Sequence, residues 1–398
     1  MTLDSQSIGE PRFTYNALST ASSFRLLTLL PAKDKDSPIV CTLEEHTTSN
    51  AELSYKALSY TWGDTSELKH ISVNGCPALV TPNLYEALQH LRALDYCKYQ
   101  WWIDAICINQ SDIHERNHQV TKMRDIFYGA NEVVAWLGPS YDNSDEVMHF
   151  IQDRSFGGID CGADHTRVYS KWGHRWCKIS DLESFLLRPY WTRLWIVQEL
   201  VVARWPTLLC GHQRLPWTFY NAFILRLKFE EPLAMEDYLL DDAADLCALR
   251  NNYRNLRGLH LATLLRSTRY AMAGEARDKV FGLLGMVGWG HGTEIAPDYE
   301  LSICSTYCNA IRVMYRDYMD ESHEKTWWLT KARECLEQYP HRPLDEDDTY
   351  RIGCDGIDCD SRRLCFIYAT SYHFVRYEMG RKVVDGFVNE DESSEEST

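Results

Sequence analysis

Glu199 is the residue whose surroundings point most directly to chemistry. It is the one charged residue in the segment 194–203, LWIVQELVVA. A helix that is apolar nearly all round is buried, and a buried carboxylate is costly unless it is paired or used. Trp195 lies four residues earlier and would share its helix face. Two interpretations stay open: a catalytic carboxylate, or a structural ion pair with one of three arginines, Arg116, Arg188 or Arg193.

Polar side chains also cluster where predicted strands end. In an open α/β sheet, ligands bind beyond the carboxyl ends of the strands. The sequence therefore predicts a polar rim that holds a sugar or a phosphate, with Trp62 as a stacking surface. The alternative is that Gly63 permits a tight turn, that Asp64 and Asp104 bond to the backbone, and that Trp62 packs in the core. The candidate binding residues are Ser59, Tyr60, Trp62, Gly63, Asp64, Asp104, Asn109, Gln110 and Trp195. Of these, Ser59, Trp62, Asp104 and Asn109 are expected to line one pocket with Glu199.

Other chemistries fit the sequence less well. A Cys–His hydrolase would need Cys107 with His114 or His118, but Cys107 follows an apolar stretch and is expected to be buried. Neither the GxSxG nor the GxxxxGK[ST] motif occurs. The tightest cysteine cluster lacks a CxxC pair and a fourth ligand, so no metal site is predicted; its members are Cys354, Cys359 and Cys365.

The elements that position these residues alternate between strands and helices. Such alternation predicts an α/β fold with a mainly parallel central sheet flanked by helices. The predicted strands are 23–30, 39–43, 55–62, 101–106, 132–137 and 207–210, with a hairpin over 70–80. Helices are predicted over 83–94, from an N-cap at Asp112, and over 192–203, after an irregular stretch.

Four segments follow from this pattern. Residues 1–22 are expected to be loose, 23–215 to form the α/β domain, and 216–320 to form a helical region packed on it. Residues 321–398 are acidic and expected to be partly disordered, because the chain ends in NEDESSEEST.

The net charge of −16 argues against nucleic acid or an anionic membrane as the main partner, because both need a concentrated basic patch. The start of the chain has no secretory pattern, and no apolar run approaches the length of about 20 residues that spans a membrane. A cytoplasmic protein with reduced thiols is therefore expected.

Four stretches, in this order, resemble the fungal heterokaryon-incompatibility (HET) domain: 55–63 (YKALSYTWG), 83–110 with WIDAICINQ at its end, 115–138 ending in WLG, and 193–199 (RLWIVQE). The resemblance implies a fungal protein of non-self recognition and programmed cell death. It also implies a remote similarity to Toll/interleukin-receptor (TIR) domains and hence a TIR/flavodoxin-like fold.

Some TIR domains cleave NAD with a glutamate in the pattern W-C-L-x-E-L, which Trp195, Glu199 and Leu200 resemble. The resemblance implies that Glu199 is catalytic and that NAD is a substrate, with no cofactor required. Cleavage of the nicotinamide–ribose bond leaves an oxocarbenium-like centre that a carboxylate stabilises. The alternative is a non-catalytic interaction module that assembles with copies of itself or with a partner of the incompatibility pathway.

Overall fold

The computed structural model of the chain describes residues 13–314, except 35, 49, 51, 154–158, 162–165, 171–175, 231–236, 257, 289–294, 304, 308 and 311–312. The predicted acidic segment 321–398 and most of the predicted loose N-terminus lie outside these residues. The chain divides into two compact units, 1–251 and 252–398, which are treated separately.

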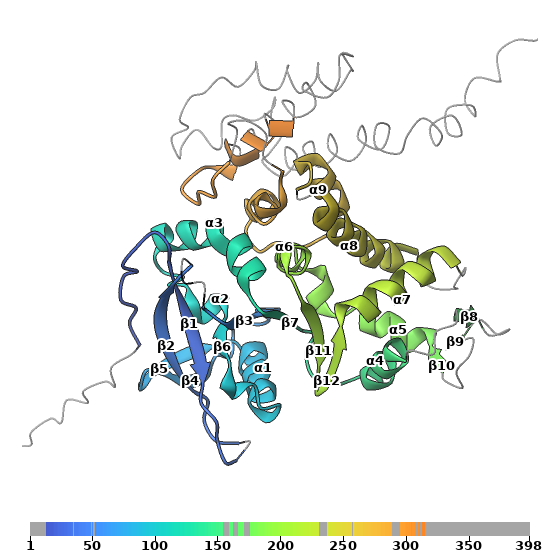
Figure 1. Cartoon of the computed structure of the whole chain (residues 1–398), viewed down its shortest axis with the longest axis horizontal. Helices are drawn as coiled ribbons and strands as arrows, with labels where there is room; N and C mark the ends of the chain where they lie inside the picture. Colours follow the sequence, from blue (N-terminus) through green and yellow to red (C-terminus); the bar gives the residue numbers. More distant parts are fainter. Residues whose placement is uncertain are drawn as a thin grey trace, which may run out of the picture. The chain divides into compact units, whose positions relative to one another are not determined.

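The first unit contains a nine-stranded sheet (Figure 1). Its strand order is β12–β11–β7–β3–β6–β1–β2–β4–β5. The strands are β1 (Ser23–Leu29), β2 (Val40–Thr47), β3 (Tyr55–Tyr60), β4 (Lys69–Val73), β5 (Cys76–Val80), β6 (Gln100–Trp102), β7 (Glu132–Trp136), β11 (Pro206–Cys210) and β12 (Gln213–Pro216). The four neighbouring strands β11, β7, β3 and β6 are parallel, whereas β1 pairs antiparallel with both β6 and β2. The predicted α/β class with a central sheet flanked by helices is confirmed, with the parallel strands at its centre.

Every residue of β3 and of β7 is buried, as parallel strands require when helices cover both faces. Two residues of opposite charge lie near the starts of these strands and form an ion pair. Lys56 forms an ion pair with Glu132 on the neighbouring strand, and Arg214 lies 2.8 Å from the second oxygen of that carboxylate.

Helices α1 (Pro82–Ala93), α2 (Asp104–Cys107), α3 (Ile113–Gly129), α4 (Ser144–Gln152), α5 (Ile179–Leu186), α6 (Trp195–Val202), α7 (Trp217–Glu230) and α8 (Asp237–Leu256) accompany the sheet, α8 ending just beyond the first unit. Figure 1 shows α3 and α6 on one side of the central strands and α1 on the other. The predicted N-cap is confirmed: Asp112 Oδ1 accepts the backbone N–H groups of His114 and Glu115, at 3.0 and 3.1 Å.

Three parts of the first unit differ from the sequence prediction. The strand expected over 101–106 ends at Trp102, and α2 follows, because Asp104 and Cys107 bond to nearby backbone N–H groups. The helix expected from Thr192 begins at Trp195, after a 3-10 turn at Pro189–Thr192. The stretch expected to be irregular contains α4, α5 and a small antiparallel sheet of β8 (Ile159–Cys161), β9 (Arg167–Ser170) and β10 (Trp176–Lys178).

In the second unit, two tyrosine hydroxyls join separate stretches of sequence by hydrogen bonds. This unit contains α9 (Leu261–Ser267) and α10 (Asp278–Phe281). The Tyr299 hydroxyl donates to Asp278 Oδ1 at 2.5 Å, and the Tyr307 hydroxyl donates to the Ala276 carbonyl at 2.8 Å. Across the described residues of both units, no helix combines the length and the apolarity needed to cross a membrane.

Candidate functional site

Trp62 and Asp104 meet where β3 and β6 end. The indole Nε1–H of Trp62 donates to Asp104 Oδ2 at 2.9 Å. Trp62 is 37% exposed, so it does not pack in the core. Gly63 follows it with φ of +73°, a left-handed conformation that glycine adopts without strain. Asn83 of α1 fixes this turn, because its amide donates to the Thr61 carbonyl and accepts from the Trp136 indole N–H.

Glu199 lies beside the end of β3, on α6, and is only 3% exposed. Burial raises the pKa of its carboxyl to about 7, and the nearby Asp104 carboxylate adds to the rise. The Arg193 cation and a hydrogen bond from the Ser59 hydroxyl lower the pKa and only partly offset burial. Its Oε2 atom has no hydrogen-bond partner among the described residues. Glu199 is therefore held next to polar groups that leave part of its hydrogen-bonding capacity unused.

A hydroxyl chain runs from Tyr190 to this carboxyl. The Ser59 and Tyr190 hydroxyl oxygens are 2.7 Å apart, and both side chains are buried. Ser59 has one proton, so when it donates to Glu199 it accepts from Tyr190. In this arrangement the Tyr190 and Ser59 hydroxyls donate in sequence toward the ionised form of the carboxyl.

Arg193 serves both carboxylates. Its guanidinium donates to the Tyr60 carbonyl, and its charge lowers the pKa of Asp104 and of Glu199. Burial nevertheless raises the pKa of Asp104. Two neighbouring carboxylates that share one cation disfavour the state in which both are ionised. Burial raises the pKa of the Tyr60 hydroxyl, which faces Asp104.

The structural alternative for Glu199 is an ion pair with an arginine. Arg188 is engaged elsewhere: it is fully buried and donates to the carbonyls of Leu137, Pro139 and Tyr141, in the loop after β7. In the residues that the structure describes, no arginine nitrogen lies within 4.0 Å of the Glu199 carboxylate. Glu199 therefore has the burial expected of a structural residue and the unpaired oxygen expected of a functional one.

The remaining candidate residues lie around this cluster with local roles. Asn109 Oδ1 accepts from the Ser111 hydroxyl at 2.7 Å, and Gln110 Nε2 donates to the Asp104 carbonyl at 3.1 Å. Asp64 is exposed and accepts from Ser66. Trp195 is half-buried. The residues that the structure brings together are Ser59, Tyr60, Trp62, Asp104, Tyr190, Arg193 and Glu199.

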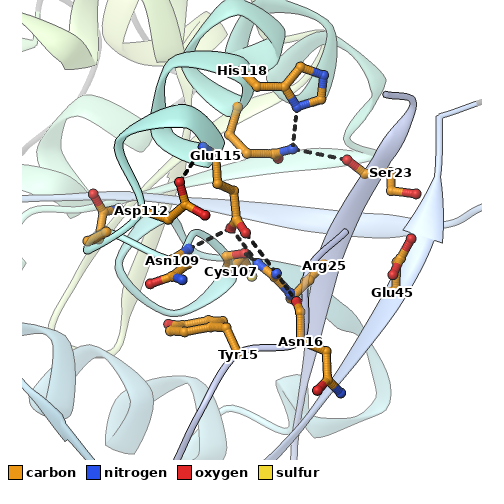
Figure 2. Close-up of polar contacts among 12 residues, drawn as sticks. Tyr15, Asn16, Ser23, Arg25, Glu45, Cys107, Asn109, Asp112, Glu115 and His118 are labelled. Carbon is orange, nitrogen blue, oxygen red and sulfur yellow. Dashed lines mark hydrogen bonds and ion pairs between the residues drawn. The ribbon is translucent and has the colours of Figure 1, made fainter. Parts of the chain in front are cut away.

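A second buried cluster centres on Arg25 and Glu115 (Figure 2). Arg25 binds both Glu115 oxygens, at 2.6 and 2.9 Å, and the two side chains are 6% and 8% exposed. Arg25 also donates to the Cys107 carbonyl, at 3.0 Å. Glu115 Oε1 accepts the Asn109 backbone N–H at 2.7 Å. The pair therefore ties β1 to both ends of the loop that joins α2 to α3.

The start of α3 also carries the run HERNH, residues 114–118, which has the HExxH spacing of zinc metalloproteases. The sequence-based prediction of no metal site overlooked this spacing. Glu115 is bound by Arg25 on both oxygens and is not free to act as a general base. Among the described residues, no group of three His, Cys, Asp or Glu side chains is placed to hold a metal ion.

Residues 55–199 match the family model described as "Heterokaryon incompatibility protein (HET)". This range contains β3, α2, α3 and all seven residues of the Glu199 cluster. The chain is also similar to "Heterokaryon incompatibility protein 6, OR allele" of Neurospora crassa, with 29% identity over 356 residues that cover 73% of this chain and 51% of the relative. The chain thus spans about half the length of that curated relative. No solved structure matches it. The match over β3, β7 and the site, together with this relative, shows that residues 55–199 are similar to the HET domain.

Proposed function

We propose that this protein acts in fungal heterokaryon incompatibility, as an effector of the cell death that follows non-self recognition. The family description and the Neurospora crassa relative both carry that name, and the matched range includes the whole Glu199 cluster. As an effector, the protein acts in the cytoplasm, through self-association or with a partner of the pathway.

We propose further that the Glu199 cluster cleaves NAD. The observation that carries this proposal is the buried Oε2 atom of Glu199, which has no partner among the described residues and lies at the carboxyl end of a parallel strand. In the reaction, the bond between nicotinamide and ribose C1′ breaks, and its electron pair leaves with nicotinamide. The Glu199 carboxylate stabilises the oxocarbenium-like centre, and water adds to C1′ to give ADP-ribose and a proton.

The surrounding residues suit such a substrate. Trp62 offers an exposed ring for stacking of a base, and its indole is oriented by Asp104. Arg193 supplies a cation beside the two carboxylates. The ionised form of Glu199 is the active one, so activity rises with pH through about 7.

One observation favours a second function, that of a non-catalytic interaction module. Glu199 is 3% exposed, so a substrate reaches it only after a covering side chain moves. In this alternative the cluster stabilises the fold, and the protein acts through contacts with copies of itself or with a partner.

The test is incubation of the pure protein with NAD, followed by chromatography for nicotinamide and ADP-ribose. Nicotinamide release that is lost in Glu199→Gln supports the enzyme. The matched control is Glu146→Gln, the same change at an exposed position on α4. Absence of turnover by the wild type, in the monomeric and in every assembled state, rules out the enzyme and leaves the interaction module.

A further inference from the structure

The Glu199 cluster and the Arg25–Glu115 pair lie at opposite ends of one short helix. Helix α2 has four residues, beginning at Asp104 and ending at Cys107. Asp104 receives the Trp62 indole N–H. The Cys107 carbonyl receives the Arg25 guanidinium. The Ile108 N–H donates to the Asp104 carbonyl at 3.2 Å, so a backbone hydrogen bond links the two ends of this turn. A movement of the Cys107 end therefore reaches Asp104.

Residues from the start of the chain hold this end of α2. The Tyr15 hydroxyl donates to the Ile106 carbonyl at 3.0 Å, and the Tyr15 ring lies against the Arg25 guanidinium, 4.9 Å from its centroid. The Asn16 carbonyl accepts from Arg25 at 2.6 Å. Burial raises the pKa of Tyr15 to about 12, so its hydroxyl keeps its proton and donates at neutral pH. Figure 2 shows Tyr15 and Asn16 gathered around Arg25.

The loop after α2 provides a second connection from the Arg25–Glu115 pair to Asp104. Glu115 accepts the Asn109 backbone N–H, and the next side chain, Gln110, donates to the Asp104 carbonyl. Asp104 is thus held from both directions by groups that depend on the Arg25–Glu115 pair.

We propose that the segment carrying Tyr15 and Asn16 controls the candidate site, by setting the position of Asp104 through Arg25 and α2. This regulation rests on the proposed function in one respect: Asp104 belongs to the site that is proposed to bind the substrate. Tyr15 and Arg25 are positioning residues, which act on the site through Asp104 and Trp62. Displacement of the segment, by a partner or by cleavage of the chain, loosens the Trp62–Asp104 bond.

The experiment follows the Trp62 indole N–H by ¹H–¹⁵N NMR of the full chain, with its signal assigned by loss in Trp62→Phe. Tyr15→Phe removes one hydroxyl and keeps the ring. The matched control is Tyr55→Phe, because the Tyr55 hydroxyl also donates to a helical carbonyl, that of Ile126 at 2.6 Å, but touches α3 instead of α2. The expected result is a shift of the Trp62 signal in Tyr15→Phe and none in Tyr55→Phe.

Arg25→Lys keeps the charge but loses the fork that binds Glu115, and it is expected to shift the same signal further. An unmoved signal in both Tyr15→Phe and Arg25→Lys overturns the proposal, and so does an equal shift in Tyr55→Phe. NAD turnover is read separately. If the wild type cleaves NAD, Tyr15→Phe lowers kcat/KM about tenfold, because small misplacements of a binding group are costly. If the wild type does not cleave NAD, the proposed function fails, while the indole signal still decides whether the segment controls Asp104.

Discussion

Replacement of Glu199 by glutamine tests how the fold holds this carboxyl. Glutamine has nearly the same shape and cannot ionise. Burial raises the pKa of Glu199 to about 7, from an ordinary value of 4.5. The folded protein therefore binds the Glu199 proton more tightly than the unfolded chain does. The stability that this proton contributes is fully present below pH 4.5 and is lost as the pH rises through about 7.

The magnitude follows from the two pKa values. Each pH unit between them corresponds to about 1.4 kcal/mol, so ionised Glu199 costs the fold about 3 kcal/mol at pH 8. Glutamine avoids this cost. Glu199→Gln is therefore expected to be more stable than the wild type, by about 3 kcal/mol at pH 8 and about 1 kcal/mol at pH 5. A residue bound by an arginine gives the opposite sign, with a loss of about 3 to 5 kcal/mol.

The assay is urea unfolding at pH 5 and pH 8, followed by tryptophan fluorescence, with Glu146→Gln as the control for loss of one exposed negative charge. The reasoning is supported if Glu199→Gln has a higher urea midpoint than the wild type at pH 8 and if the difference between the two midpoints is smaller at pH 5. A variant less stable than the wild type at pH 8 would refute it, because it would mean that a cation depends on this carboxylate.

Three further changes test the neighbouring contacts. Ser59→Ala removes a hydrogen bond that lowers the pKa of Glu199, so the pH at which activity rises is expected to move upward. A pH–rate profile measures this, and a rise at the wild-type pH contradicts it. Trp62→Ala is expected to weaken substrate binding about 5- to 150-fold, which corresponds to about 1–3 kcal/mol for one stacked base. The melting temperature is expected to change little, because the side chain is partly exposed. Calorimetric titration with NAD measures the loss of binding. Arg25→Met leaves the Glu115 carboxylate buried without its cation and is expected to cost about 3 to 5 kcal/mol in urea unfolding; a cost below about 1 kcal/mol would show that the pair is dispensable.

The sheet could be predicted from the sequence because its strands are short apolar runs between turn signals. The strand expected over 55–62 and its buried neighbour at 132–137 appear as β3 and β7 with small changes at their ends. The sequence did not indicate α2, because the apolar run WWIDAI has no periodicity long enough to separate a strand from a single helical turn. The small sheet of β8, β9 and β10 was also missed, since its strands have three or four residues each.

The site was partly accessible, for a reason that Glu199 illustrates. A lone charge in an apolar helix predicts burial whatever its partners are, and burial is what the structure has. Partners from distant segments do not leave such a pattern. Tyr190 reaches Ser59 across 131 positions of sequence, and nothing in the stretch PYWTR marks its hydroxyl as part of the cluster. Asn109 follows α2 instead of the end of β6, and its side chain bonds to Ser111, which strand ends alone do not reveal.

The energetics of the Glu199 cluster favour the proposed catalytic role over a purely structural one. A fold that needs only packing at this position loses about 3 kcal/mol at alkaline pH by using a carboxyl in place of a neutral side chain of similar size. The neighbours do not remove that cost: Arg193 and Ser59 lower the pKa, yet it stays at about 7. They make the carboxyl ionisable at neutral pH without saturating it, since Oε2 has no partner in the described residues. A residue that stabilises the fold has no need of this balance, whereas a general base or an electrostatic catalyst works best with a pKa near the working pH. The comparison of Glu199→Gln with the wild type therefore separates the two roles in one variant. A gain in stability together with a loss of NAD cleavage is the result expected of a catalytic residue, and a loss of stability is the result expected if the carboxyl stabilises the fold, as in the interaction module.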